Sequence, residues 1–406
     1  MSATSNTADQ VWVRKMNRAI ILQVFRTNPT LSRARLATET GLNPSTVSAI
    51  IGELIQDNLI RETDLIQSST GRPGRLLEIN PEGGCALGIE IGVDYIEFLI
   101  TDFAVNVVWR QKQSTNPEIG QEEIMQKVSH LAKIASAIIQ DRQSHLLGVG
   151  VGIPGLVDVS SGLLRIAPNL HWVNVPIRDV LAKYFDCPIY VENDANAAAL
   201  GEYYFGAVRN VKNFIYLNTG VGLGGGFVIG GKLFRGMFGY AGEVGHMILD
   251  VNGDLCGCGK RGCWETFVGP HAVEQRVQHS LTAGAKSILN DMVKGDIQNI
   301  VFDDVVQAAK MGDQTSMDAL AKVAFYLGIG IANLVNLLNV EVIVLGGALN
   351  NASSFILEDI ERVVSANTLA PGKEHLRIIP SAHGADACVM GAIALVLDEI
   401  LREPVF

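Results

Sequence analysis

The chain has 406 residues, of which 48% are hydrophobic and 18% charged, enough to bury large cores in two or three domains. No apolar run matches the length of a membrane span, and residues 1–10 are polar with no apolar stretch after them. These features argue against a membrane protein and against a signal peptide, so we expect a cytoplasmic protein.

Charge is unevenly distributed along the chain. The net charge is −10, yet residues 1–80 hold nine Lys and Arg against seven Asp and Glu. That segment therefore has a net charge of +2, and the remainder of the chain has a net charge of −12. Only the N-terminal segment is electrostatically suited to meet a polyanion such as nucleic acid. The contrast is modest, so it supports a nucleic-acid contact without establishing one.

The N-terminal segment begins with two predicted helices. Apolar side chains recur at helical spacing over residues 13–25, and Pro29 marks the end of this helix. Ser32 is placed to cap a second, short helix in which Leu36 and Ala37 face inward.

A third helix follows a tight turn at residues 40–42. Asn43 is its predicted cap, Pro44 lies in its first turn, and apolar residues between 47 and 55 line one face. A short helix, a glycine-containing turn and a capped helix form the helix-turn-helix pattern.

In that pattern the start of the third helix enters the major groove of DNA. Strands at residues 59–61 and 76–79 predict a wing, and its tip at 71–75 carries two arginines suited to a minor groove. The alternative is a three-helix packing module with a solvated basic loop, and the wing and the charge contrast favour DNA binding. The candidate DNA-binding residues are Arg33, Arg35, Ser45, Thr46, Ser48, Arg72 and Arg75.

From residue 83 onward, apolar strands alternate with longer helical segments, which is typical of α/β architecture. Several of these strands end in glycine or polar residues. In two successive α/β halves such ends meet at a cleft, where ligands bind. Strands are predicted at 85–92 and 95–101, as a hairpin, and at 146–153, 189–191, 214–217 and 342–347, with a helix at 124–140.

One imidazole and three thiols lie close together in the segment between Glu243 and Glu265. Glycines at 257, 259 and 262 let this short loop bend round an ion. Three thiolates and one imidazole form a closed tetrahedral zinc site. The alternative is a disulfide or plain buried thiols, which a reducing cytoplasm disfavours. The candidate zinc ligands are His246, Cys256, Cys258 and Cys263. The other three cysteines are isolated in apolar stretches, and we expect them in the core: Cys85, Cys187 and Cys388.

Several motifs occur in one order along the body. They are Gly-Ile-Pro-Gly-Leu-Val-Asp at 152–158, Glu-Asn-Asp-Ala-Asn at 192–196, Thr-Gly-Val-Gly at 219–222, and Glu243-x-x-His246 with the cysteine cluster. Together they resemble the ROK family of sugar kinases and of transcriptional repressors with a kinase-like body behind a DNA-binding head. The head resembles the repressor branch, of the xylose repressor and N-acetylglucosamine repressor types. The resemblance implies an actin-like ATPase (ribonuclease H-like) body of two lobes.

The resemblance also implies a sugar site. Asn193 and Asp194 match a sugar-contacting pair, with Asp194 at the general-base position of the kinases. His246 would serve both zinc and sugar if one ring nitrogen ligates and the other faces the cleft. Carboxylates and amides suit sugar hydroxyls, although Asn193 and Asp194 have the alternative of a plain helix cap. The candidate sugar-binding residues are Asn169, Asn193, Asp194, Glu243, His246 and Glu265.

A kinase must hold ATP through two phosphate loops. Family kinases resemble Asp-x-Gly-Gly-Thr at the first, where this chain has Val93 and Asp94 in the segment 90–94. Val93 blocks close backbone approach, and Asp94 places an anion where phosphate oxygens would lie. The second loop, residues 219–226, persists in outline, with Asn218 where kinases commonly have glycine. We therefore expect no ATP binding and no catalytic residue.

These observations lead to the hypothesis of a sugar-responsive repressor of carbohydrate metabolism genes. A monosaccharide, with xylose or glucose as first candidates, would lie in the cleft of a degenerate sugar-kinase fold braced by structural Zn²⁺. The head would bind operator DNA as a homodimer or a dimer of dimers, because one small module makes too few contacts. Closure of the cleft on the sugar would shift the heads.

The predicted domains are a winged helix-turn-helix head (1–82), a first lobe (83–191, completed by about residues 385–406) and a second lobe with the zinc loop (192–384). Two alternatives stay open. One is an ATP-dependent sugar kinase with an accessory N-terminal domain, and the other is a sensor inactivated by a partner protein rather than by a sugar.

Overall fold

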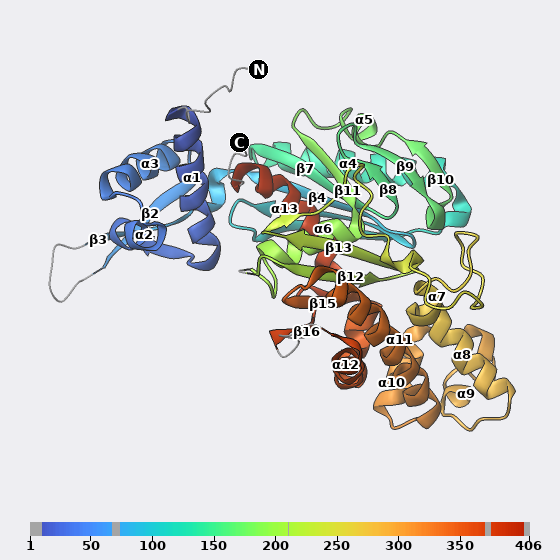
Figure 1. Ribbon diagram of the computed structural model, residues 1–406. Helices are drawn as coiled ribbons and strands as arrows, with labels where there is room; N and C mark the ends of the chain where they lie inside the picture. Colours follow the sequence, from blue (N-terminus) through green and yellow to red (C-terminus); the bar gives the residue numbers. More distant parts are fainter. Residues whose placement is uncertain (1–9, 67–73, 210, 370–374, 402–406) are drawn as a thin grey trace, which may run out of the picture.

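The computed structural model describes residues 10–66, 74–209, 211–369 and 375–401 (Figure 1). A small head of three helices and a three-stranded sheet lies beside a larger α/β body (Figure 1). The body is built on two five-stranded sheets and a smaller three-stranded one. This confirms the predicted fold class.

The caps that the sequence predicts in the head are present. The Ser32 side chain accepts a hydrogen bond from the backbone N–H of Arg35, and Asn43 accepts one from Ser45. Gly41 ends the second helix at φ 69°, a left-handed conformation that glycine adopts without strain. The head helices are α1 (Gln10–Thr27), α2 (Arg33–Thr40) and α3 (Pro44–Gln56).

The wing is a three-stranded antiparallel sheet with the order β1-β3-β2. The sequence predicts two of its strands and misses the first, which is too short to show alternation of apolar and polar residues. The missed strand pairs with β3 through Leu31 and Leu77, both buried in the core of the head. The strands are β1 (Thr30–Ser32), β2 (Ile60–Ile66) and β3 (Gly74–Ile79).

The first body sheet has the order β11-β7-β4-β5-β6, with α4 (Gln121–Asp141) packed on one face. The sequence predicts every strand except the polar edge strand β6. The predicted domain boundary after residue 191 falls inside β11, and the domain limits stay a prediction. The strands are β4 (Cys85–Ile91), β5 (Tyr95–Asp102), β6 (Val107–Ser114), β7 (Leu146–Ile153) and β11 (Ile189–Asn193).

A small antiparallel sheet leads from β7 toward β11, and it was not predicted. Its order is β10-β9-β8, and the short 3-10 turn Pro168–Leu170 lies between two of its strands. Asn169 lies on that turn and is exposed. The elements are β8 (Leu156–Asp158), β9 (Leu163–Ala167), β10 (Trp172–Val175) and α5 (Ile177–Leu181).

The second body sheet has the order β14-β13-β12-β15-β16. One expectation is corrected here, because residues 223–226 of the predicted loop belong to strand β13. Three of them are glycines, and helix α6 (Asp194–Tyr204) packs closely on this strand: a Cβ at Gly226 would lie 2.4 Å from the carbonyl oxygen of Ala195. The strands are β12 (Phe214–Thr219), β13 (Leu223–Ile229), β14 (Lys232–Leu233), β15 (Val342–Gly347) and β16 (Arg377–Pro380).

One helix of the second lobe corrects the expectation that no apolar run matches the length of a membrane span. Helix α11 is long and apolar enough to cross a membrane, but 56% of that window is buried inside the protein. It packs against α8, α10 and α12, so it is a core helix of this lobe. The helices are α7 (Glu265–Val268), α8 (Pro270–Thr282), α9 (Leu289–Met292), α10 (Phe302–Lys310), α11 (Gln314–Leu338) and α12 (Ala348–Asn367).

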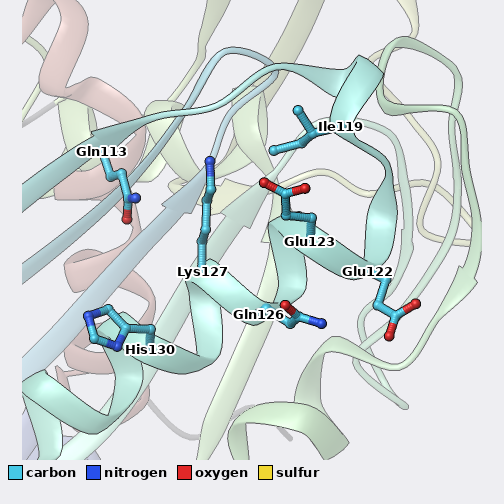
Figure 2. A pocket seen from close by; sticks show the side chains of 7 residues that line it. All are labelled: Gln113, Ile119, Glu122, Glu123, Gln126, Lys127 and His130. Atoms are coloured by element: carbon cyan, nitrogen blue, oxygen red, sulfur yellow. The ribbon is translucent and has the colours of Figure 1, made fainter.

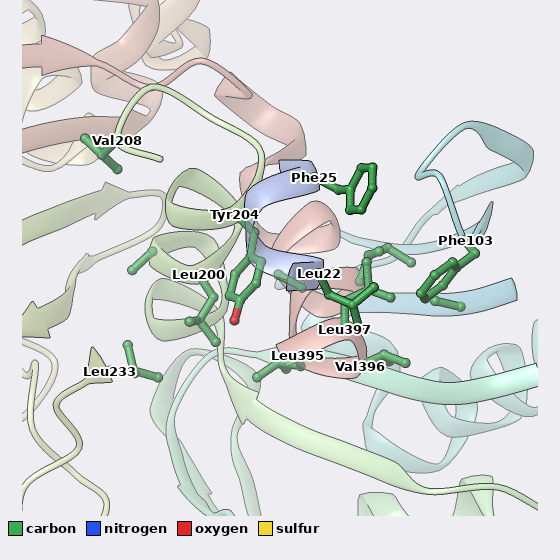
Figure 3. Close-up of a cluster of buried hydrophobic side chains, with 14 of the residues drawn as sticks. Leu22, Phe25, Phe103, Leu200, Tyr204, Val208, Leu233, Leu395, Val396 and Leu397 are labelled. Carbon is green, nitrogen blue, oxygen red and sulfur yellow. The ribbon is translucent and has the colours of Figure 1, made fainter. Parts of the chain in front are cut away.

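Two helices, α6 (Asp194–Tyr204) and α13 (Ala387–Leu401), pack tightly against each other in the body. Their backbones touch: a Cβ at Gly391 would lie 1.8 Å from the carbonyl oxygen of Ala197. Leu22 and Phe25 of α1 belong to the same hydrophobic core as both helices (Figure 3). The core of the head is therefore continuous with the core of the body.

Candidate sugar and metal site

The candidate site begins where β11 ends and α6 starts. The side chain of Asn193 caps α6, because its Oδ1 accepts hydrogen bonds from the backbone N–H groups of Ala195 (2.9 Å) and Asn196 (3.2 Å). Its Nδ2 donates to the carbonyl oxygen of Gly155 at 3.1 Å. The plain-cap alternative thus describes the Asn193 side chain, which also forms a hydrogen bond with the Asp194 carboxylate. Its sugar contact stays a prediction.

Asp194 is the first residue of α6 and is half-buried. Its Oδ2 accepts a hydrogen bond from Nδ2 of Asn218 at 3.2 Å. Burial raises the pKa of Asp194, and its charge contributes to raising the pKa values of Glu90 and Glu243. Three carboxyl groups from different elements therefore share one electrostatic environment around Asp194.

Asn169 and Glu265 both lie close to Gly222, at the turn between β12 and β13, although they are far apart in sequence. A Cβ at Gly222 would lie 2.8 Å from Oε2 of Glu265 and 3.7 Å from Nδ2 of Asn169. The Glu265 Oε2 atom also accepts a hydrogen bond of 3.4 Å from the backbone N–H of Leu223. Glycine at 222 leaves room here, because a side chain would crowd the Glu265 carboxylate.

The four predicted zinc ligands lie together. One ligand atom from each of them lies within 4.8 Å of all the others. The Sγ atoms of Cys258 and Cys263 are 3.7 Å apart, as are Cys256 Sγ and His246 Nδ1. Tetrahedral zinc with Zn–S bonds of about 2.3 Å has S–S edges of roughly 3.8 Å, so the donor set fits this metal. Burial raises the pKa of the Cys256 thiol, and a bound cation would favour its thiolate.

The cluster of candidate metal ligands adjoins the candidate sugar site through His246. Its Nδ1 is 3.4 Å from Oε1 of Glu265, and its Nε2 is 3.9 Å from Oε2 of Glu243. Cys256 also donates to Oε1 of Glu265 at 2.8 Å. Glu243 precedes a 3-10 turn, Val244–His246, that carries the histidine. The ring therefore lies between two carboxylates, and its double role toward metal and sugar stays a prediction.

The segment corresponding to the first phosphate loop contains a buried carboxyl group. Glu90 is only 7% exposed, and its Oε1 accepts a hydrogen bond of 2.5 Å from the Tyr95 hydroxyl. Burial raises the pKa of Glu90 to about 8. Lys112 Nζ lies 3.5 Å from the centre of the Tyr95 ring, and Asp94 is exposed at the hairpin turn.

Two cations on β6 are already paired near this segment. Glu97, fully buried beside Glu90, forms ion pairs with Arg110 and with Lys112, the latter at 3.4 Å. Arg110 also donates to Asp386, with 2.8 Å between its Nη1 and Oδ2 of the carboxylate. Both cations on this strand are therefore engaged by carboxylates.

A shallow surface hollow lies beside the start of α4 (Figure 2). None of the candidate sugar-binding residues lines it. Its side chains carry both charges and several are exposed, which is typical of a solvated surface and not of the predicted cleft. The lining residues are Gln113, Ile119, Glu122, Glu123, Gln126, Lys127 and His130.

The candidate DNA-binding residues gather around α2, α3 and the wing. Ser45 and Ser48 are exposed on α3, and Thr46 is half-buried. Glu62 pairs with both Arg33 (2.8 Å) and Arg75, and these arginines lower the pKa of Glu62. Phosphates would have to displace Glu62 from them. Arg35 lies 3.5 Å from Glu39, and Arg72 lies outside the described residues.

Comparison with known proteins gives two family matches. The ROK family model matches residues 86–399, and a winged helix-turn-helix DNA-binding model matches residues 19–61. The chain is 33% identical over 394 residues to the xylose repressor of Caldicellulosiruptor bescii, covering 97% of this chain and 98% of that protein.

Two solved structures superpose on this chain, one over nearly its whole length and one over a shorter part. A ROK family transcriptional regulator, a homologue of the Escherichia coli MLC protein, superposes with a TM-score of 0.80 and 28% identity, covering 96% of this chain and 99% of that one. A ROK glucokinase from Streptomyces griseus, in complex with glucose and AMPPNP, superposes with a TM-score of 0.69 and 30% identity. The match covers 77% of this chain and 99% of that one. The resemblance seen in the sequence is thus confirmed: the chain belongs to the ROK family and carries the winged helix-turn-helix head of its transcriptional regulators.

Proposed function

We propose that this sugar-responsive, DNA-binding repressor of the ROK family holds a monosaccharide against Asp194, Glu243, Glu265 and Asn169. The position of both Asn169 and Glu265 beside Gly222 carries the proposal, because it gathers donors and acceptors from distant segments of the chain. Such groups pair with sugar hydroxyls. Xylose is the first candidate because the compared repressor is named for it, and glucose is the second because the glucokinase was solved with it.

The bound metal in this proposal is zinc, and its role is structural. The three thiols and one imidazole match its preferences, and His246 and Cys256 contact Glu265 directly. The ion would hold the loop that carries both Glu243 and Glu265 in a fixed position. Asn193 would support the same site by capping α6.

The protein acts as a sensor without phosphoryl transfer in this proposal. Asp94 stands at the first phosphate loop, and the nearby Arg110 and Lys112 are paired with Glu97. Phosphoryl transfer depends on cations that neutralise the phosphates, and these two are engaged elsewhere. Asp194 then serves as a hydrogen-bond acceptor for a sugar hydroxyl and not as a base.

The sugar signal would reach DNA through two helices. Helix α6 starts at Asp194 and ends at Tyr204, whose hydroxyl donates a hydrogen bond to Asp398 of α13. Helix α13 in turn shares a core with Leu22 and Phe25 of α1 in the head (Figure 3). A shift of α6 on sugar binding would move α13 and reorient the head. The head would act in a homodimer or a dimer of dimers on operator DNA in the cytoplasm.

A DNA-binding titration tests this function. A duplex selected by the full-length protein from a random pool is titrated by fluorescence anisotropy with and without D-xylose or D-glucose. We expect one sugar to change the DNA affinity at least about tenfold, a coupling of typical size. Asp194→Ala is expected to abolish the response and keep DNA binding, and the exposed Lys322→Ala on α11 is the control.

Two results would contradict the proposal. Unchanged DNA affinity with every monosaccharide tried would favour a sensor inactivated by a partner protein. Sugar-dependent ATP turnover of a few per second in a coupled assay would instead establish a kinase.

A further inference from the structure

Asn218 occupies a central position in the second sheet, one residue before the end of β12. It lies between Gly224 of β13 and Gly346 of β15, and its side chain is half-buried. Both of these neighbours are glycines. The amide group of Asn218 therefore extends from the sheet without a competing side chain at either flanking position.

Two other elements lie close to this amide. Its Nδ2 donates to Oδ2 of Asp194 at 3.2 Å. Its Oδ1 lies 2.9 Å from the position that a Cβ on Gly347 would take, where φ is +63° and a side chain would be strained. Glycine at 347 therefore leaves room for the amide, and the hydrogen bond to Asp194 orients it.

A hydrogen-bond donor without net charge has a specific effect beside Asp194. Glu90, Glu243 and the Cys388 thiol interact electrostatically with the Asp194 carboxylate and, when ionised, repel it. A hydrogen bond to the charged form favours that form. An amide supplies this bond without a net charge, so the carboxylate keeps its full strength as an acceptor for a hydroxyl group.

We infer that Asn218 is a positioning residue for the sugar, which holds one oxygen of Asp194 in place and keeps it an acceptor. The inference rests on the proposed sugar site at Asp194. No candidate sugar residue of the sequence analysis lies on β12, so Asn218 adds an element of the second sheet to that site. A sugar held by Asp194 would thereby be coupled to β12 and β15 as well as to α6.

Asn218→Asp gives the sharpest test because it keeps the shape and replaces the donor with an acceptor. Calorimetry of the full-length chain with D-xylose, or with D-glucose if that is the sugar bound, is performed between pH 5.5 and 8. At pH 7 two carboxylates would face each other, and we expect affinity at least about tenfold below that of the wild type. Affinity should then recover as the pH falls, because the two carboxylates come to share a proton.

Asn213→Asp is the matched control. Asn213 lies just before β12 at its other end, and its Nδ2 donates to Oε1 of Glu341 at 3.1 Å. The same change there should leave sugar affinity and its pH profile unaltered. Asn218→Ala, which removes the donor and adds no charge, should bind the sugar about tenfold more weakly without the recovery at low pH. Circular dichroism and binding to DNA check the folding of each variant.

The outcomes separate this inference from the proposed function. Wild-type chain that binds no monosaccharide overturns the proposed function and this inference with it. Wild-type chain that binds sugar while Asn218→Asp binds it equally well, with the same pH profile, overturns the inference alone. Wild-type sugar affinity in Asn218→Ala would likewise overturn the inference alone.

Discussion

At the scale of single residues, the site is defined by how carboxyl groups are satisfied. Asp194 has an amide donor and Glu265 has a thiol and a backbone N–H. Glu90 has the Tyr95 hydroxyl on Oε1, and its buried Oε2 has no hydrogen-bond partner among the described residues. Its pKa of about 8 follows from that burial. Glu90 is therefore a carboxyl group whose protonation should affect stability strongly.

Glu90→Gln should change the pH dependence of stability. The pKa of Glu90 is about 8 when folded against 4.5 when unfolded, so between these values the folded state binds the extra proton. The contribution of Glu90 to the free energy of unfolding of the wild type therefore falls as pH rises from 4.5 to 8, by about 1 kcal/mol per pH unit. The variant lacks this loss, so its stability relative to wild type in urea unfolding should rise from pH 5 to pH 8.

The exposed Glu123→Gln on α4 is the control for that change. The glutamine introduced in place of Glu90 keeps an oxygen to accept the hydrogen bond from Tyr95, so packing is retained. A constant difference in unfolding free energy between Glu90→Gln and wild type across this pH range would show that Glu90 titrates normally.

At the scale of elements, α6 and α13 approach each other closely at glycines. A Cβ at Gly391 would lie 1.8 Å from the carbonyl oxygen of Ala197, and one at Gly201 would lie 2.9 Å from the backbone nitrogen of Gly391. Backbone atoms cannot move aside as a flexible side chain can. The two helices are thus a rigid pair, a requirement for carrying movement from Asp194 to the head.

Gly391→Ala should separate this helix pair. We expect a loss of about 2 kcal/mol or more in the free energy of unfolding, because the added methyl group overlaps the backbone of α6. The control is Gly52→Ala in α3, where a Cβ meets nothing within 4 Å. That change should be neutral or stabilise by up to about 1 kcal/mol, since alanine favours helix. Equal melting temperatures for Gly391→Ala and wild type would disprove the close packing.

At the scale of the whole molecule, a metal cluster in one loop would brace a site shared by several segments. Cys256→Ser, or treatment with a chelator, should therefore lower the melting temperature and weaken sugar binding at least about tenfold. The isolated, half-buried Cys187→Ser is the control. Binding of the head to DNA should persist, since the loop that holds the cluster, just before α7, lies well apart from the head (Figure 1).

Metal analysis of the purified chain by mass spectrometry accompanies that experiment. Wild-type protein should contain zinc in a one-to-one ratio, and Cys256→Ser should contain much less. Purified wild-type protein without bound metal, with stability insensitive to the chelator, would rule out the structural role.

The sequence by itself determined the features that depend on neighbouring residues. The caps at Ser32 and Asn43 satisfy backbone N–H groups two or three residues away, so their spacing is visible in the chain. The same holds for the cluster of candidate metal ligands, where three cysteines lie within eight residues. The buried strands of the two large body sheets were also visible for the most part, because such strands are continuous apolar runs.

Only the tertiary structure decided which distant groups meet. Gly222 lies beside both Asn169 and Glu265, and Asn218 reaches Asp194 across 24 residues. These contacts depend on how two sheets pack around α6, and no local pattern encodes that packing. The core shared by α1 and α13 has the same origin, since its members come from opposite ends of the chain. Local hydrogen bonding fixes short-range structure, whereas burial of apolar surface is non-directional and leaves the choice of partners to the complete fold.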